Sequence, residues 1–186
     1  MCIIDRPETK TTTWPRDVIA TRRLTLRRPE GRDVDAITRL AGDYAIASMT
    51  TSMPHPYQTA DASRFVSLVA AQDRARENTF VIEHDGEGLV GAVGFHRAGK
   101  APLEMGYWIG RPYWGRGYAT EASQAAMNWA RDDWRQKLVI AGHFADNTAS
   151  ANVLVKTGFL YTGEVQPRHS RARGQIAPTR MMVWLA

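Results

Sequence analysis

A chain of 186 residues, with 44% hydrophobic and 23% charged residues, has the length and composition of one soluble globular domain, which can bury a core without disulfides or metals. No apolar run approaches the roughly 18 residues of a membrane span, and the single cysteine, Cys2, excludes an intramolecular disulfide and fits a reducing cytoplasm. The net charge of +5 favours an anionic partner, but there is no Lys/Arg block with interleaved aromatic residues and no zinc or helix-turn-helix signature to indicate nucleic acid.

The first element predicted is an N-terminal arm. Residues 1–20 are polar, lack the apolar core of a signal peptide, and are expected to be extended or mobile. Residues 21–186 are expected to form the domain. Its first strand is predicted at residues 22–28, where Leu24 and Leu26 alternate with polar neighbours.

Helices and strands then follow in a mixed order. Asp33 is placed to cap a first helix, a loop with two prolines occupies residues 49–58, and helical spacing of apolar residues from about Ala60 predicts a second helix. Periodicity and turn residues predict further strands at residues 79–83, 89–96, 103–109, 137–144, 159–165 and 179–185, and residues 171–174 are predicted to connect the last two. A helix with Ala122 and Trp129 on its buried face, and a shorter one ending at Gly158, separate the later strands. This order predicts an α/β fold with a mixed sheet.

The most informative segment is the glycine turn at residues 115–117, between a strand and a helix. Glycine lets the backbone approach an anion closely, and the first N–H groups of a helix have no intrahelical partner, so we expect a phosphate at residues 115–120. A nucleotide-triphosphatase loop is excluded, because Tyr118 and Ala119 follow Gly117 where Lys and Ser/Thr are required, and a dinucleotide fingerprint fits poorly. A turn that only joins strand to helix is the alternative.

The flanking residues resemble a known family. The GNAT N-acetyltransferases have an acyl-CoA loop of the form Q/R-x-x-G-x-G/A, which is similar to Trp114-Gly-Arg-Gly-Tyr-Ala119, except that Trp114 replaces the Gln/Arg. The chain also resembles the Rim-type branch of ribosomal-protein acetyltransferases at residues 23–29, 53–57, 106–109, 119–122 and 146–159. The resemblance covers roughly residue 21 to the C-terminus. It implies the GNAT fold, a mixed sheet of about six to seven strands in which two central parallel strands splay apart to admit acetyl-CoA.

The resemblance also implies a cofactor site. The backbone of the glycine turn would hold the CoA pyrophosphate, and the strand before it would bind the pantetheine arm through its main chain. The residues expected to contact acetyl-CoA are Tyr107, Trp108, Ile109, Trp114, Gly115, Arg116, Gly117, Tyr118, Ala119, Thr120, Asn147, Ser150 and Lys156. Packing is the alternative role for Trp108 and Trp114, and a solvated side chain is the alternative for Arg116. No spacing of ligand residues indicates a metal site.

Asn147 and Ser150 lie three residues apart, on one face of the predicted short helix. In Rim-like enzymes this pattern places the Asn on the pantetheine and the Ser near the thioester sulfur, whereas helix capping by Asn147 is the alternative. Many GNAT enzymes have a Tyr as general acid where this chain has Leu154. Ser150 or a water is therefore the candidate acid.

The implied reaction is direct acetyl transfer to an amine, which must first lose a proton. An α-amine has a pKa of about 7.7–8.0 and a lysine one of about 10.4, so an α-amine needs only a modest base. Glu104 is the first candidate for this base, His169 the second and His55 the third, while a solvated strand-end carboxylate is the alternative for Glu104. The remaining histidines, His84, His96 and His143, are expected to be ordinary strand residues.

The acceptor is expected to be a protein N-terminus or a small amine, bound in a cleft formed by residues 43–77 and the connection at 166–178. A non-catalytic acyl-CoA-binding module of the same fold is the alternative function, because Leu154 stands where many GNAT enzymes have a Tyr as general acid. A basic nucleic-acid-binding protein is a third reading, which the mixed charge distribution disfavours. Exposed aromatic residues could support a homodimer, but the sequence leaves the oligomeric state open.

Overall fold

The computed structural model describes residues 16–186, so Cys2 and most of the expected arm lie outside the described residues. The last residues assigned to the arm belong to the sheet. Ile19 and Ala20 pair with Leu26 and Thr25, and the side chain of Ile19 is buried in the main core. The apolar side chain of Ile19 therefore brings this end of the arm into the domain.

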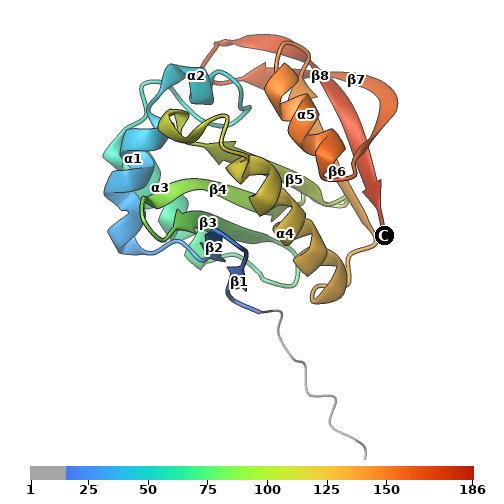
Figure 1. Cartoon of the computed structure of the whole chain (residues 1–186). Helices are drawn as coiled ribbons and strands as arrows, with labels where there is room; N and C mark the ends of the chain where they lie inside the picture. The colour runs from blue at the N-terminus through green and yellow to red at the C-terminus, as the bar shows by residue number, and fades with distance from the viewer. Residues whose placement is uncertain (1–15) are drawn as a thin grey trace, which may run out of the picture.

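Eight strands form one open, mixed sheet, which is a mixed α/β architecture as predicted (Figure 1). The eighth strand is the two-residue β1, which the sequence did not predict. Their spatial order is β1-β2-β3-β4-β5-β6-β8-β7. The strands are β1 (Ile19–Ala20), β2 (Leu24–Arg27), β3 (Asn78–His84), β4 (Gly88–His96), β5 (Glu104–Ile109), β6 (Leu138–Phe144), β7 (Leu160–Ser170) and β8 (Gln175–Leu185).

The strands β5 and β6 are the only parallel neighbours in the described sheet, and they separate almost at once. Glu104 pairs with Ile140, and the Ile140 N–H donates to the Leu103 carbonyl at 2.8 Å. Beyond this point β5 is paired only with β4, and β6 only with β8. A gap therefore opens in the middle of the sheet, which confirms the splayed strands implied by the family resemblance.

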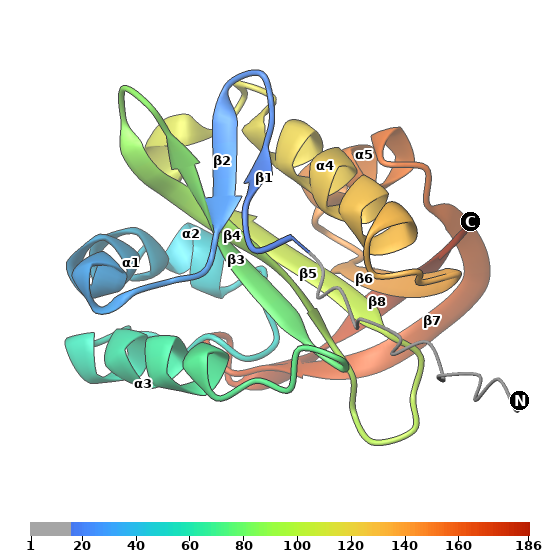
Figure 2. The same cartoon turned by 90° about the horizontal axis from the view of Figure 1, so that it is seen from below.

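Helices cover both faces of the sheet (Figure 2). One face carries α1 (Val34–Ala41), α2 (Tyr44–Ala47) and α3 (Thr59–Ala70), and the other carries α4 (Tyr118–Asp132) and α5 (Thr148–Lys156). The predicted apolar face of α4 is confirmed, since Ala122, Ala126 and Trp129 are buried against the sheet. None of the helices within residues 16–186 combines the length and the apolar character needed to cross a membrane.

Two local predictions differ from the structure. Asp33 precedes α1, but its carboxylate accepts hydrogen bonds from Arg27 and from the Glu30 N–H instead of capping the helix. The expected connection at residues 166–178 is mostly strand, because Gln166 to Ser170 pair in continuous antiparallel register with residues 175–179. Residues 171–174 form the turn between β7 and β8, which confirms the predicted connection between the last two strands.

Candidate active site

A cavity of about 1230 Å³ is lined by residues from both sides of the gap between β5 and β6. Gly115 and Ser150 line it from the α4 and α5 face, while Tyr57 and Phe65 line it from the α3 face. Single small-molecule sites usually measure about 300–1,000 Å³. The cavity therefore has room for two ligands, one from each face of the sheet.

The glycine turn borders the cavity at the start of α4. Gly115 and Gly117 have φ angles of +76° and +79°, in the left-handed region that favours glycine. No atom lies within 4 Å of the position that a Cβ of Gly115 would take, so the backbone faces open space. Gly117 is the N-cap of α4, whose first N–H groups therefore point out of the helix. This arrangement fits an anion such as the CoA pyrophosphate.

Arg23 and Glu121 brace this turn from behind, a pair that sequence reasoning did not identify. The Arg23 side chain donates to Glu121 at 2.7 Å and to the Arg116 carbonyl at 3.0 Å, and Thr21 donates to Glu121 at 2.7 Å. Burial alone would raise the pKa of Glu121, but the hydrogen bonds from Thr21 and Arg23 outweigh it and lower the pKa. Both residues lie in segments that carried the family resemblance, which was the available signal.

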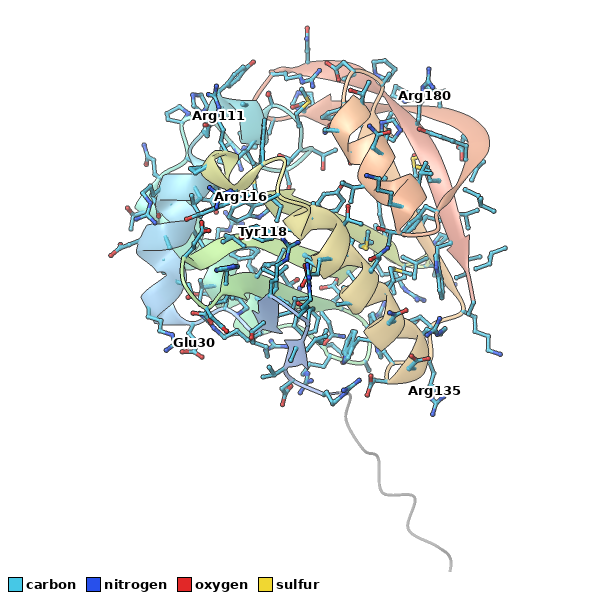
Figure 3. The ribbon with its side chains drawn as sticks, viewed as in Figure 1. Glu30, Arg111, Arg116, Tyr118, Arg135 and Arg180 are labelled. Carbon is cyan, nitrogen blue, oxygen red and sulfur yellow. The ribbon has the colours of Figure 1, made fainter. Side chains whose placement is uncertain are left out.

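The two flanking side chains of the turn have structural contacts. The Trp114 indole N–H donates to the Ile109 carbonyl at 2.6 Å, and its ring also lines the cavity. The guanidinium of Arg116 pairs with Glu87 at 2.6 Å, and Arg116 is not among the cavity-lining residues. Arg116 and Tyr118 lie close together beside the start of α4 (Figure 3). Tyr118 is buried in the core, with its ring 5.2 Å from that of His84.

Alternation along β5 decides which groups face the gap. The Gly110 N–H donates to the Val90 carbonyl of β4. In an antiparallel ladder every second residue forms such hydrogen bonds, so the even-numbered residues of β5 direct their N–H and C=O groups toward β4. The N–H and C=O groups of Tyr107 therefore point toward the gap. Tyr107 thus keeps the expected main-chain position. The main chain of Trp108 faces β4 and not the gap, so it does not have the expected position, although the Trp108 side chain lines the cavity. The Ile109 carbonyl already accepts from Trp114.

The N-terminus of α5 meets Tyr107 across the gap. Asn147 caps the helix, since its Oδ1 accepts from the Ser150 N–H at 3.0 Å, and it also lines the cavity. Ser150 Oγ lies 2.9 Å from the Tyr107 hydroxyl. Burial raises the pKa of Tyr107 to about 12, against a smaller lowering by Ser150. Leu154 is buried in the core, where its role is packing.

Arg173 forms a strap that joins several residues lining the cavity, although Arg173 is not itself among them. The Arg173 guanidinium donates to both carboxylate oxygens of Asp146, at 2.8 and 3.1 Å, and lies 4.7 Å from the centre of the Phe144 ring. It also donates to the Ser48 carbonyl and contacts Met49 Sδ at 3.1 Å. The hydrogen bond from Arg173 lowers the pKa of Asp146.

Backbone contacts extend the strap. Ser170 Oγ donates to the Thr50 carbonyl at 3.0 Å, and the Arg171 N–H donates to the Thr51 carbonyl at 3.0 Å. The turn at 171–174 therefore holds the loop after α2, and the predicted acceptor regions do meet at the cavity.

The base candidates are placed differently from one another. Glu104 lines the cavity, and its carboxylate is held by the Arg168 guanidinium, with Nη2 3.1 Å from Oε2. Neither His169 nor His55 is among the described lining residues, and both are exposed. His169 follows Arg168 on β7, so alternation turns its side chain to the opposite face.

Two histidines expected to be ordinary strand residues do line the cavity. These are His96 and His143. Both ring nitrogens of His143 are occupied, by the Phe144 carbonyl at 2.8 Å and the Tyr161 hydroxyl at 3.0 Å. The positions of His96 and His143 depend on which strand ends border the gap. Local sequence does not show this. Within residues 16–186 no group of three or more His, Cys, Asp or Glu residues is arranged to hold a metal ion.

The comparison with protein families agrees with this geometry. The family model described as the acetyltransferase (GNAT) domain matches residues 23–160, well over half of the chain. The chain belongs to the GNAT acetyltransferase family. It is therefore an N-acetyltransferase whose cofactor is acetyl-CoA, and the family predicted from the sequence is confirmed.

Individual GNAT relatives are similar over most of their length. The uncharacterized N-acetyltransferase p20 of Bacillus licheniformis is 25% identical over 169 residues, which are 89% of this chain and 94% of p20. RimJ of Mycobacterium smegmatis, solved with a CoA disulfide, has a TM-score of 0.79 at 24% identity, over 93% of this chain and 88% of RimJ. RimL, a ribosomal L7/L12 α-N-protein acetyltransferase solved with coenzyme A, has a TM-score of 0.77 at 18% identity, over 90% of this chain and 97% of RimL. At these identities the two solved structures show a shared fold.

The GNAT cofactor residues expected from the sequence lie together, with one exception. All of them except Arg116 line the same cavity, from Tyr107 on β5 to Lys156 at the end of α5. Of the three expected catalytic residues, Ser150 and Glu104 line it and His169 does not.

Proposed function

We propose that this GNAT protein transfers the acetyl group of acetyl-CoA to the α-amine of a protein N-terminus or of a small molecule. The observation that carries the proposal is the continuity of the cavity. It joins the glycine turn at α4 to an acceptor side under α3, through the gap that opens where β5 and β6 separate at Glu104 and Ile140. A cofactor and an acceptor entering from opposite faces would meet in this gap.

The cofactor side divides into three parts. The backbone of Gly115 and Gly117, together with Thr120 at the start of α4, would hold the pyrophosphate. The main chain of Tyr107 and the side chain of Asn147, which line the cavity, would border the pantetheine. Acetyl-CoA supplies an acyl carbon activated as a thioester, and Ser150, which lines the same cavity, would lie near its sulfur.

The charges on the acceptor side favour an α-amine. Among the described lining residues only Asp61, Glu104 and Asp146 are acidic, and Arg168 and Arg173 hold the last two. Such a site is poorly suited to bind a polycation or to deprotonate a lysine.

An α-amine is easier to deprotonate than a lysine side chain. About a tenth of an α-amine is neutral at pH 7, against fewer than about one in a thousand lysines, a difference worth about 3–4 kcal/mol. We propose that Glu104, acting through a water, accepts the proton that the amine loses. His169 is exposed and outside the cavity lining, which makes it the weaker candidate.

The test combines binding and turnover. Calorimetry should show acetyl-CoA binding, and release of the CoA thiol should be fastest with N-terminal peptides or amino-acid amines and slow with lysine side chains and polyamines. Glu104→Gln should lower kcat, while the exposed Glu164→Gln should not. Binding without thiol release from any amine would instead indicate the non-catalytic module, and an absence of binding would overturn the cofactor assignment.

The remaining partners belong to the same proposal. We propose a homodimer formed through the outer hairpin, because β7 is an edge strand and Leu160, Val165 and Ile176 are exposed on it and on β8. Sedimentation analysis of the wild type and of Val165→Lys tests this, and a wild-type monomer at micromolar concentration would contradict it. A cytoplasmic location and the lack of a nucleic-acid partner remain expectations, and a binding titration at low salt tests the second.

A further inference from the structure

We infer that Tyr107 is a positioning residue for Ser150: its hydroxyl donates a hydrogen bond to Ser150 Oγ, which leaves the Ser150 proton free to stabilise negative charge on the departing sulfur. This inference deepens the proposed function and rests on it. It assigns to the side chain of Tyr107 a role separate from that of its main chain.

The two hydroxyls come from elements on opposite sides of the gap. Tyr107 is on β5, Ser150 is in the first turn of α5, and their oxygens are 2.9 Å apart. The Tyr107 hydroxyl also lies 3.4 Å from the Ser150 carbonyl, which is a much longer contact. The shorter distance favours Ser150 Oγ as the partner of the phenol.

Negative charge on the sulfur fixes the direction of this hydrogen bond. If Ser150 donates to the sulfur, its oxygen can only accept from Tyr107, so the hydrogen bonds run from phenol to serine to sulfur. Hydrogen bonds in such a chain strengthen one another. The partial positive charge at the N-terminus of α5 favours an anion at the same place.

Burial of Tyr107 keeps the phenol in the form that can donate. Because burial raises its pKa to about 12, the hydroxyl stays protonated over the whole range in which an amine acceptor is studied. Tyr107 is therefore a donor that does not titrate, and it is too weak an acid to protonate a thiolate with a pKa near 8.5. Its contribution is orientation of Ser150.

The transfer step balances without a proton from either hydroxyl. The amine nitrogen forms a bond to the acetyl carbon, the carbon–sulfur bond breaks, and its electron pair leaves on sulfur. The amine proton passes through water to Glu104. Ser150 donates a hydrogen bond to the sulfur throughout and keeps its proton.

The kinetic test compares Tyr107→Phe, Ser150→Ala and the double variant. Ser150→Ala should lower kcat about 100-fold, and Tyr107→Phe about tenfold, with the acceptor KM and the acetyl-CoA affinity unchanged. In the Ser150→Ala background, Tyr107→Phe should cost less than about twofold, because the two groups act as one unit. Thr162→Val removes an exposed hydroxyl on β7, outside the cavity lining and the acceptor regions, and is the control.

A second readout does not depend on turnover. Ultraviolet absorbance of the CoA thiolate in the product complex gives the pKa of the bound thiol, which should lie below the free value of about 8.5 and rise by about one unit in Tyr107→Phe. An unchanged thiol pKa and unchanged kcat in Tyr107→Phe would overturn the inference while leaving the proposed function intact. Effects of the two variants that simply multiply would also overturn it. A wild-type chain with no turnover on any amine would overturn both.

Discussion

Arg23 Nε lies 2.7 Å from Glu121 Oε2, and this contact ties the start of β2 to the first turn of α4, directly behind the glycine turn. The same guanidinium lies 4.8 Å from the centre of the Tyr118 ring and donates to the Arg116 carbonyl. The conformation of the glycine turn therefore depends on Arg23, which lies 93 positions before Arg116 in the chain.

Removing this brace should weaken cofactor binding more than folding. In Arg23→Met or Glu121→Gln, the turn loses a charge-assisted hydrogen bond, so we expect acetyl-CoA affinity to fall about tenfold, with a loss of about 1 kcal/mol in the free energy of unfolding. Calorimetry and urea unfolding measure the two effects. The double variant should be little worse than either single one, and additive losses would show that the residues act separately.

Glu121 also predicts a pH dependence of stability. Its pKa is lower in the folded chain than the usual value of about 4.3, so its contribution is fully present above that value and is lost as the pH falls through the folded pKa. The free energy of unfolding from urea titrations between pH 3 and pH 7 should therefore fall less steeply at acid pH in Glu121→Gln than in the wild type. Parallel curves for the two proteins would contradict the assignment.

The glycine turn can be tested with a matched backbone control. Gly117 and Gly99 have similar positive φ angles, +79° and +59°, so valine should strain the backbone by a similar amount at either site, about 1–2 kcal/mol. Only Gly117 borders the cavity. Gly117→Val should reduce acetyl-CoA affinity at least about tenfold, whereas Gly99→Val should lose stability alone. Equal affinities for the two variants would show that the turn does not hold the cofactor.

The arginine strap should affect the acceptor and spare the cofactor. Arg173→Met leaves Asp146 and the loop carbonyl of Ser48 without their shared donor, so we expect the acceptor KM to rise about tenfold with little change in acetyl-CoA affinity. Arg180→Met is the control, since Arg180 is exposed on β8 and takes no part in the strap (Figure 3). A variant whose acceptor KM matches that of the wild type would mean that the strap is not needed to shape the acceptor side.

Most strands and helices were predictable, because their signals are local. The alternation of Leu24 and Leu26, the apolar face of α4 and the glycine at 158 all act over a few residues, and each prediction is confirmed. The connection at residues 171–174 is confirmed, but the prediction was wrong for residues 166–170 and 175–178, which extend the last two strands. Pairing between β7 and β8 lengthens both strands, since the ladder satisfies the backbone groups whatever the side chains are.

The cofactor side follows from the sequence because its parts are adjacent in the chain. The glycine turn is joined directly to the first turn of α4, and Asn147 lies three residues before Ser150, so local geometry alone brings their groups together. The acceptor side depends on long-range pairing. Whether Glu104 faces the cavity depends on the register of β5 against β4, and its arginine partner comes from β7, 64 residues away. A strand's register is set by packing over the whole sheet, and a shift of one residue turns every side chain to the other face. The tertiary structure therefore decided which acidic residue and which hydroxyls meet in the gap.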